Sequence, residues 1–210
     1  MNEPARLVVC ASGGGRTLEN LAERIAADGL PARIELVVLS KPGLGAEERA
    51  RRLGLPTVVV GRATHPDPEA RREALLAAVR QARPDWVLLA GWLSLFPIPP
   101  ELEGRVLNVH PALLPAHGGR GCYGMHVHRA VAAWGEAVSG CTVHFADDRY
   151  DQGAVIVRQA VPLPEGADAE TIAARVFEAE KRAYPEALGH VLAGRVRFED
   201  GRAVWRHPGL

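Results

Sequence analysis

The sequence of 210 residues has few cysteines and almost no lysine. Cys10, Cys122 and Cys141 lie far apart, and an odd number of thiols in a chain that looks intracellular argues against a disulfide framework. We therefore expect small buried or half-buried thiols. Lys41 and Lys181 are the only lysines, beside abundant Arg, Ala, Gly and Pro. We attribute this bias to the source genome, because it points to no particular chemistry.

Long apolar runs and excess charge are also absent. No apolar stretch reaches the roughly 18 to 20 residues that span a bilayer. The chain enters a strand-like run directly after Met-Asn-Glu-Pro, without a charged leader or an apolar signal core, so we expect a cytoplasmic location. Basic and acidic residues both number 25, so the net formal charge is zero and no broad basic face is implied. We expect no nucleic acid and no membrane as partners, and any bound anion must meet a local site.

Short apolar runs alternate with helical patterns in the first half of the chain. The pattern predicts strands at 6–11, 34–40, 56–60, 85–90 and 105–110, and helices near 18–27, 46–53 and 68–82. These strands are continuous and rich in Val, Ile and Leu, as expected when helices cover both faces of a parallel sheet. Asp67 before Pro68 signals a helix start, because Asp caps free amides and Pro at the first helical position loses no hydrogen bond.

The pattern changes after His110. It predicts a Gly-rich loop at 118–124, a short helix near 128–134, two antiparallel strands at 139–146 and 154–161, a long helix from a cap at Asp168 to Leu188, and a hairpin around Asp200–Gly201. The fold class is therefore α/β: a Rossmann-like, mostly parallel sheet with helices on both faces, then C-terminal antiparallel strands and a long helix. We expect one domain over residues 1–210, with halves at 1–100 and 101–210.

A glycine cluster between the first strand and the first helix is a candidate phosphate site. Glycines let the backbone approach a ligand closely, and free amides at a helix N-terminus attract an anion. The loop lacks the Gly-Lys-Ser/Thr ending of a nucleoside-triphosphate loop, and Leu18 stands where a dinucleotide fingerprint has a small residue, so ATP and NAD are disfavoured. The alternative is that the glycines only form a tight turn between the strand and the helix and bind no ligand. The candidate phosphate-binding residues are Gly13, Gly14, Gly15, Arg16 and Thr17.

Asn108 and His110 lie at the carboxyl end of a predicted parallel strand, where α/β proteins place their ligands. Two residues apart on a strand, they point to the same side of the sheet. An amide and an imidazole can both donate hydrogen bonds to an oxyanion formed at a carbonyl carbon. Pro111 and Pro115 restrict the loop that follows. A structural role is the alternative for a histidine at such a position.

A turn-rich loop joins the two late strands and carries Asp147, Asp148 and Asp151. Carboxylates in such loops are usually solvated. However, the segments NVHPALLP, SGCTVHF and YDQG together resemble the signature of the 10-formyltetrahydrofolate-dependent formyltransferase family, in order and spacing from Leu107 to Gln159. The resemblance extends to SKPGLGAEERA, LLAGWL and IAARVFEAEKRAYP, nearly the whole chain. Mapped onto this sequence, the catalytic trio of the family is Asn108, His110 and Asp151.

The resemblance implies a function and its substrates. The SGGG loop resembles the phosphate loop of family members that act on glycinamide ribonucleotide and is not a feature of relatives that act on methionyl-tRNA. It implies formyl transfer from the co-substrate 10-formyltetrahydrofolate to the amine of that nucleotide in purine biosynthesis, without a metal. The halves would then bind the nucleotide phosphate (1–100) and the folate and reacting groups (101–210). The sequence leaves open a monomer or a homodimer.

The resemblance also implies binding roles outside the trio. Glu180 matches an acidic residue that contacts the nucleotide, at its ribose hydroxyls. Trp92 and Leu93 would form walls for the pterin, with backbone groups of the same strand end as its hydrogen-bonding partners, although ordinary core positions are the alternative. The implied folate-binding residues are Leu89, Gly91, Trp92, Leu93, Ala146, Asp147 and Tyr150.

Several positions depart from the family pattern. Arg16 and Thr17 stand where many relatives have Ser or Thr followed by Asn, so the phosphate gains a guanidinium contact in place of a small hydroxyl. Ser94 and Pro68 stand where Arg is frequent, which puts the usual charge contacts to the folate tail and the phosphate in doubt. The segment HGGRGCYGMHVH is longer than in some relatives. Its histidines and Cys122 raise a zinc site as an alternative, which the lack of a paired ligand spacing disfavours.

Two other functions compete with this reading. A formyltetrahydrofolate hydrolase would use a similar trio but pass the formyl group to water, and such proteins carry an extra N-terminal domain. A noncatalytic phosphate-ligand or metal-binding module on a Rossmann-like sheet predicts no role for Asn108 or Asp151.

Overall fold

The computed structural model describes residues 3–206, in two compact units that divide between Leu107 and Asn108. The boundary falls inside strand β5 (Val106–His110). The single domain with halves at 1–100 and 101–210 stays a prediction. Within the described residues, no helix combines the length and the apolar character needed to span a bilayer.

The first unit is built on four parallel strands. They are β1 (Ala5–Ala11), β2 (Ala32–Leu39), β3 (Thr57–Val59) and β4 (Trp86–Leu89), in the spatial order β3-β2-β1-β4. The central strands are fully buried along most of their length, as at Val8, Val9, Val37, Val38 and Leu88. Burial on both faces explains why their sequences are continuously apolar.

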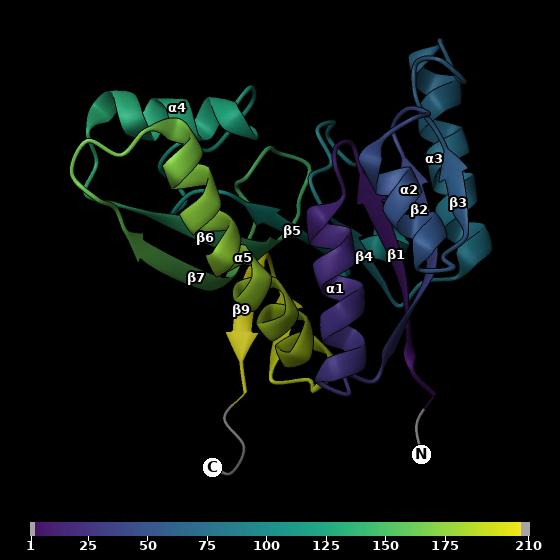
Figure 1. Ribbon diagram of the computed structural model, residues 1–210. Coiled ribbons are helices and arrows are strands. Elements are labelled where there is room, and N and C mark those ends of the chain that lie inside the picture. The colour runs from purple at the N-terminus through teal and green to yellow at the C-terminus, as the bar shows by residue number, and fades with distance from the viewer. Residues whose placement is uncertain (1–2, 207–210) are drawn as a thin grey trace. The chain divides into compact units, whose positions relative to one another are not determined.

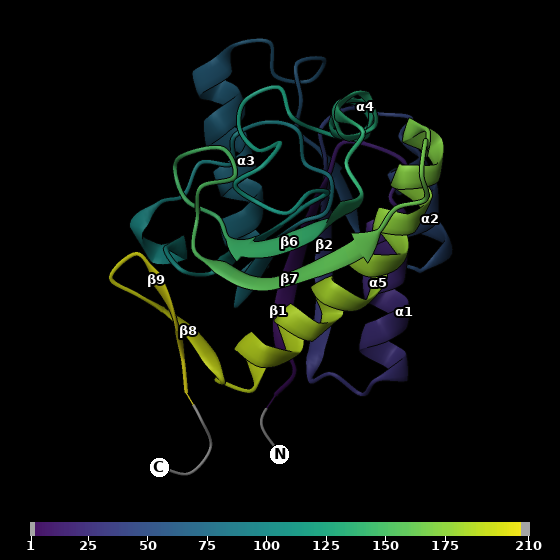
Figure 2. The ribbon, with the colours of Figure 1, turned by 90° about the vertical axis from the view of Figure 1, so that its left-hand side faces the viewer.

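Helices cover both faces of this sheet. Figure 2 shows α1 (Arg16–Ala27) and α2 (Gly45–Arg52) on one side of β1 and β2, and α3 (Pro68–Ala82) on the other. Right-handed crossovers require this, because the chain moves outward from β1 to β3 and then returns to β4. The Asp67 side chain accepts a hydrogen bond from the Ala70 amide at 2.8 Å, so α3 begins as predicted.

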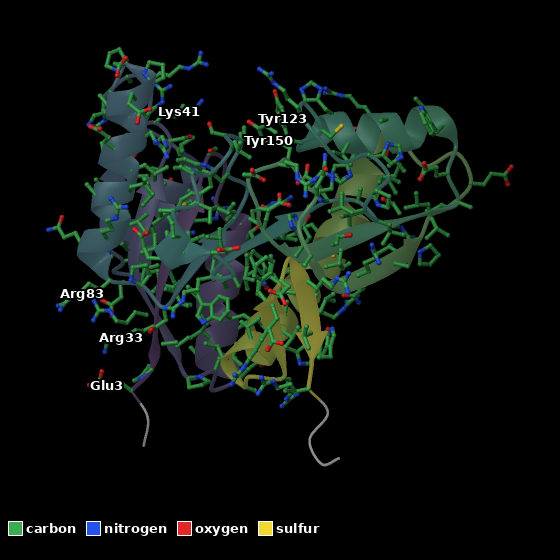
Figure 3. All side chains as sticks on the ribbon, turned by 180° about the vertical axis from the view of Figure 1, so that it is seen from behind. Glu3, Arg33, Lys41, Arg83, Tyr123 and Tyr150 are labelled. Carbon is green, nitrogen blue, oxygen red and sulfur yellow. The ribbon has the colours of Figure 1, made fainter. Side chains whose placement is uncertain are left out.

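Because the strands are parallel, their carboxyl ends all lie at one end of the sheet. Figure 3 labels Arg33 near the start of β2 and Lys41 just after its end, and thus marks the two ends of the first unit. The loop from Ser12 to Gly15 follows β1 and lies at the Lys41 end. The glycine cluster is therefore at the ligand-binding end of the sheet.

The second unit combines an antiparallel strand pair with a long helix. Its elements after β5 are α4 (Met125–Trp134), β6 (Val138–Phe145), β7 (Val155–Pro162), α5 (Ala169–Leu192), β8 (Val196–Glu199) and β9 (Arg202–Trp205). The spatial order is β5-β6-β7, with β6 and β7 antiparallel, and α5 packs on both. Figure 1 shows α5 beside β6 and β7, with β9 near the end of the helix. The predicted fold class is confirmed.

Two helix boundaries differ from the prediction by three residues or more. Helix α4 begins at Met125 rather than near His128, directly after Gly124, whose positive φ of 50° ends the loop. Helix α5 continues to Leu192, because the buried Val191 adds a further apolar contact after the predicted end. A short 3-10 turn, Pro100–Leu102, was not predicted. The C-terminal hairpin was predicted, and its turn residues Asp200 and Gly201 have φ of 48° and 76°.

Candidate active site

The structure brings Asn108, His110 and Asp151 together within the second unit. Oδ1 of Asp151 lies 3.3 Å from Nδ2 of Asn108 and 3.3 Å from Nδ1 of His110. Strand β5 supplies the first two residues and the loop between β6 and β7 supplies the third. Asn108 and His110 therefore point to the same side of the sheet, as strand periodicity predicted. The amide of Asn108 and the imidazole of His110 share one carboxylate oxygen of Asp151.

His110 is 3% exposed, and both of its ring nitrogens face oxygen acceptors. Nδ1 faces Asp151, and Nε2 lies 2.8 Å from the carbonyl oxygen of His117. A neutral imidazole has one N–H and can satisfy only one of these acceptors, whereas an imidazolium satisfies both. Asp151 and the His117 carbonyl therefore hold the ring from both of its nitrogens.

His144 of β6 completes the hydrogen bonding around Asn108. Its Nδ1 lies 2.9 Å from the Phe145 carbonyl oxygen and therefore carries the proton, which leaves Nε2 to accept from Asn108 Nδ2 at 3.1 Å. Burial lowers the pKa of His144, in keeping with this neutral tautomer. Asn108 consequently donates one N–H to His144 and the other to Asp151.

The Asp151 carboxylate is held in its charged form. Burial by itself raises the pKa of Asp151, but the hydrogen bond and the charge of His110, the Gly119 amide and His144 together bring that pKa below its usual value. Gly119 donates to Oδ2 of Asp151 at 3.0 Å. The backbone of Asp151 is left-handed, with φ of 57°, a conformation that costs energy for a residue other than glycine and that recurs at functional sites.

The segment after Pro115 also contacts the trio. His117 presents its carbonyl to His110, while its ring pairs with Glu136 at 2.7 Å and packs edge-on against Trp134. With the Gly119 amide on Asp151, this segment satisfies polar atoms of two trio residues. The sequence had left its role open. In this structure the segment supplies hydrogen-bonding partners to His110 and Asp151.

The glycine cluster lies in the first unit, at the start of α1. Gly13 and Gly14 are exposed, and Gly15 precedes the helix with a positive φ of 81°. Arg16 and Thr17 are the first residues of α1, as the phosphate-site prediction requires. No side chain caps the helix, so its first amides are not covered by a capping group.

The predicted pterin segment lies beside the glycine cluster within the same unit. The Ser12 amide donates to the Gly91 carbonyl at 3.1 Å, and the Leu93 amide donates to Oγ of Ser12 at 3.2 Å. Leu89 is buried at the end of β4, whereas Leu93 is 45% exposed and so is not an ordinary core residue. Nε1 of Trp92 is buried and has no hydrogen-bond partner among residues 3–206.

The remaining predicted residues lie in the second unit. Ala146, Asp147 and Tyr150 belong to the loop between β6 and β7, where Asp147 accepts from Arg149 at 2.9 and 3.0 Å. Figure 3 shows Tyr150 and Tyr123, from the Gly-rich loop, at the same end of this unit. Glu180 is half-buried on α5. Burial of Cys141 raises the pKa of its thiol to about 12, and the charge of Glu180 is the second cause of that rise.

Two departures from the family pattern now have a structural description. Pro68 is the first residue of α3, where it supports the helix start, and Ser94 is exposed after β4. The three cysteines are free. Within residues 3–206, no group of three His, Cys, Asp or Glu side chains is arranged to hold a metal ion. The absence of a metal from the reaction stays a prediction.

Sequence reasoning missed His144 and His117. His144 lies inside the SGCTVHF segment. Its place in a strand that follows the strand of Asn108 and His110 could have indicated a contact with them. His117 acts through its backbone carbonyl, which has no signature in residue type. Only the conformation of the loop reveals that contact.

Comparisons with known proteins identify the family of this chain. Residues 5–188 match the family model described as formyl transferase. The chain is 35% identical over 209 residues to the chloroplastic phosphoribosylglycinamide formyltransferase of Vigna unguiculata, covering 98% of this chain and 64% of that protein. It is 37% identical to part of the trifunctional purine biosynthetic protein adenosine-3 of Drosophila pseudoobscura pseudoobscura, covering 91% of this chain but 14% of that protein. The chain thus spans less than two thirds of these two relatives.

A solved structure matches over almost its whole length. The glycinamide ribonucleotide transformylase 1 of Symbiobacterium toebii superposes with a TM-score of 0.88 at 32% identity, covering 98% of this chain and 95% of that one.

Proposed function

This chain belongs to the formyl transferase family, and we propose that it transfers the formyl group of 10-formyltetrahydrofolate to the amine of glycinamide ribonucleotide. The products would be formylglycinamide ribonucleotide and tetrahydrofolate, in purine biosynthesis. The observation that carries the proposal is the single carboxylate oxygen of Asp151 shared by Asn108 and His110. The names of the relatives and the glycine cluster support the choice of a phosphorylated amine.

The amine attacks the formyl carbon and gives a tetrahedral intermediate whose oxygen carries negative charge. The His110 imidazolium stabilises that oxygen through Nε2, while Asp151 holds the ring from Nδ1. In this structure the His117 carbonyl occupies Nε2 of His110. The substrate oxygen must therefore replace an internal acceptor.

Asn108 has two roles in the proposed mechanism, since its side-chain amide both positions Asp151 and donates a hydrogen bond to the oxyanion. It donates to Asp151 and His144 and so fixes the carboxylate that holds His110. To donate to the oxyanion as well, it must release one of these partners. Asp151 helps to route the amine proton to the departing folate nitrogen, through water.

We assign binding roles within each unit by itself. Gly13 to Thr17 bind the phosphate, which makes the two-substrate reaction nearly intramolecular, and Glu180 binds the ribose hydroxyls. Leu89, Gly91, Trp92 and Leu93 hold the pterin, whose polar atoms give the buried Trp92 N–H an acceptor. Within the second unit, Ala146, Asp147 and Tyr150 are the residues that we assign to folate binding. We keep the prediction of a monomer or homodimer in the cytoplasm, although the plant relative is named chloroplastic.

One assay separates transfer from its competitors. The protein is incubated with 10-formyltetrahydrofolate, with and without glycinamide ribonucleotide, and release of tetrahydrofolate is followed. Release that requires the nucleotide supports transfer. Release without it indicates a hydrolase, and binding of both ligands without release indicates a noncatalytic module.

A further inference from the structure

The carbonyls of the glycine cluster are all tied to protein donors of the first unit. The Gly13 oxygen accepts from the Ala46 amide at 3.2 Å, the Gly14 oxygen from Nη1 of Arg49 at 2.7 Å, and the Gly15 oxygen from the Glu19 amide at 3.0 Å. Two of these donors, Ala46 and Arg49, belong to α2, which lies beside α1 (Figure 1). Helix α2 therefore fixes the loop through its carbonyl groups.

The contact between α2 and the loop is close enough to exclude side chains. A Cβ on Gly15 would lie 2.5 Å from Cα of Ala46, and a Cβ on Gly45 would lie 2.9 Å from the Gly14 oxygen. On the other side, added Cβ atoms at Gly13 and Gly14 would meet nothing within 4 Å. The loop is thus packed against α2 on one side and open on the other.

Fixing these carbonyls also fixes the amides. In a planar trans peptide the C=O of one residue and the N–H of the next point in opposite directions. Arg49 holds the Gly14 carbonyl and so directs the Gly15 N–H, while Ala46 does the same for the Gly14 N–H. Within residues 3–206, the N–H groups of Gly13, Gly14 and Gly15 have no acceptor, so they are available to an anion.

Glu19 of α1 keeps Arg49 in place. Its Oε2 accepts from Nε of Arg49 at 2.8 Å, and its Oε1 accepts from Nη2 of Arg52 at 2.6 Å. The Arg49 guanidinium thus joins a carboxylate to a loop carbonyl through two different nitrogens, which its planar fork permits. Because Glu19 lies against the guanidinium, its charge offsets the field of Arg49 at the loop.

We propose that Arg49 is a positioning residue for phosphate binding: by holding the Gly14 carbonyl, it aims the Gly15 amide at the phosphate of the substrate. The inference rests on the phosphate role proposed above for Gly13 to Thr17. It assigns Arg49 an effect on nucleotide binding and none on the reacting groups. Arg52 shares Glu19 but makes no hydrogen bond to the loop within residues 3–206, so it is a matched control of the same charge.

The test compares Arg49→Ala and Arg49→Met with Arg52→Ala in the full chain. Inorganic phosphate is titrated into ¹⁵N-labelled protein while the amide signals of Gly13 to Gly15 are followed, and KM for glycinamide ribonucleotide and kcat are measured at saturating folate. Both Arg49 variants should weaken phosphate binding and raise KM about tenfold, as expected for loss of a hydrogen bond from a charged donor, with kcat nearly unchanged. Arg52→Ala should leave all three quantities close to those of the unmodified protein.

Arg49→Lys distinguishes geometry from charge, since a single ammonium keeps the charge but not the fork. Weak phosphate binding by this variant supports the proposal, and full recovery overturns it. Equal weakening by Arg52→Ala and Arg49→Ala also overturns it, as does an unchanged phosphate affinity in the folded Arg49→Met protein. If phosphate leaves the Gly13 to Gly15 amides of the unmodified protein unmoved, the phosphate assignment itself fails, a result independent of any variant.

Discussion

At the scale of single residues, Asp151 combines a functional charge with an unusual backbone. Its φ of 57° is tolerated by Asp and Asn better than by most residues. Asp151→Asn therefore keeps the loop and removes only the charge that faces His110. We expect turnover to fall by a factor of about 100 or more, with nucleotide binding retained.

The measurement is single-turnover formyl transfer, beside nucleotide binding by calorimetry. Asp148→Asn is the matched control in the same loop, because the Asp148 side chain is 92% exposed and lies away from the trio's hydrogen bonds. Unchanged turnover in Asp151→Asn would remove Asp151 from the mechanism.

His144 gives a prediction about stability and pH. Its pKa is lowered from 6.5 by burial, so below pH 6.5 the unfolded chain binds a proton that the folded protein does not. The contribution of His144 to stability is therefore complete above pH 6.5 and is lost as pH falls toward the folded pKa, by at most about 1.4 kcal/mol per pH unit. His144→Gln removes this titration.

Urea unfolding of both proteins at several pH values checks the prediction. The free energy of unfolding of the unmodified protein should approach that of His144→Gln as the pH falls from about 7.5 to about 5.5. A difference that is constant with pH would mean that His144 titrates alike in both states.

The same residues show what the sequence could and could not predict about the site. The strand period predicted that Asn108 and His110 point to the same side of the sheet, whereas the place of Asp151 beside them was implied by the resemblance to the formyltransferase family. The internal partners were not predictable, because His117 contacts His110 through a carbonyl and Gly119 contacts Asp151 through an amide. Every residue has those groups, so only backbone conformation decides which of them face the trio.

At the scale of elements, the start of α3 depends on one cap. The Asp67 side chain caps the helix by accepting a hydrogen bond from the Ala70 amide. Asp67→Ala should lower the free energy of unfolding by about 1 kcal/mol, whereas Asp67→Ser should retain most of the stability. Glu69→Ala is the control in the same helical turn, and a loss as large as that of Asp67→Ala would assign the effect to charge rather than to capping.

The loop between β6 and β7 depends on Gly153. A Cβ at this position would lie 1.8 Å from the Phe145 carbonyl oxygen, the atom to which His144 donates. Gly153→Ala must therefore displace the strand end that precedes Asp151, and we expect it to lower both the unfolding temperature and turnover. Gly166→Ala is the comparison for backbone strain without a steric clash, because Gly166 has an open environment and a positive φ of 66°. Full activity in Gly153→Ala would show that the loop moves without disturbing the trio.

Element prediction succeeded where local signals and burial agreed. Helix α3 was predicted from Pro68 to Ala82, as observed, because Asp67 and Pro68 mark its start. The beginning of α4 and the end of α5 were less accurate, since Gly124 conformation and tertiary burial of Val191 decide them. A propensity pattern does not contain either quantity.

At the scale of the whole molecule, charge balance limits how an anionic substrate can be attracted. Acidic and basic residues number 25 each, so no net field draws the nucleotide toward the protein. In the phosphate site that we propose, binding depends on short contacts of the Gly13 to Gly15 amides, which salt screens far less than charges more than about 10 Å apart.

We therefore expect kcat/KM for glycinamide ribonucleotide to change by less than about threefold between about 0.05 and about 0.2 M sodium chloride. Inorganic phosphate at the same ionic strength should compete with the nucleotide, because it fits the same amides and chloride does not. The measurement is kcat/KM at saturating folate in both salt series. A steep dependence on chloride would instead mean that an extended basic surface guides the substrate, so that the local loop contributes little to its capture.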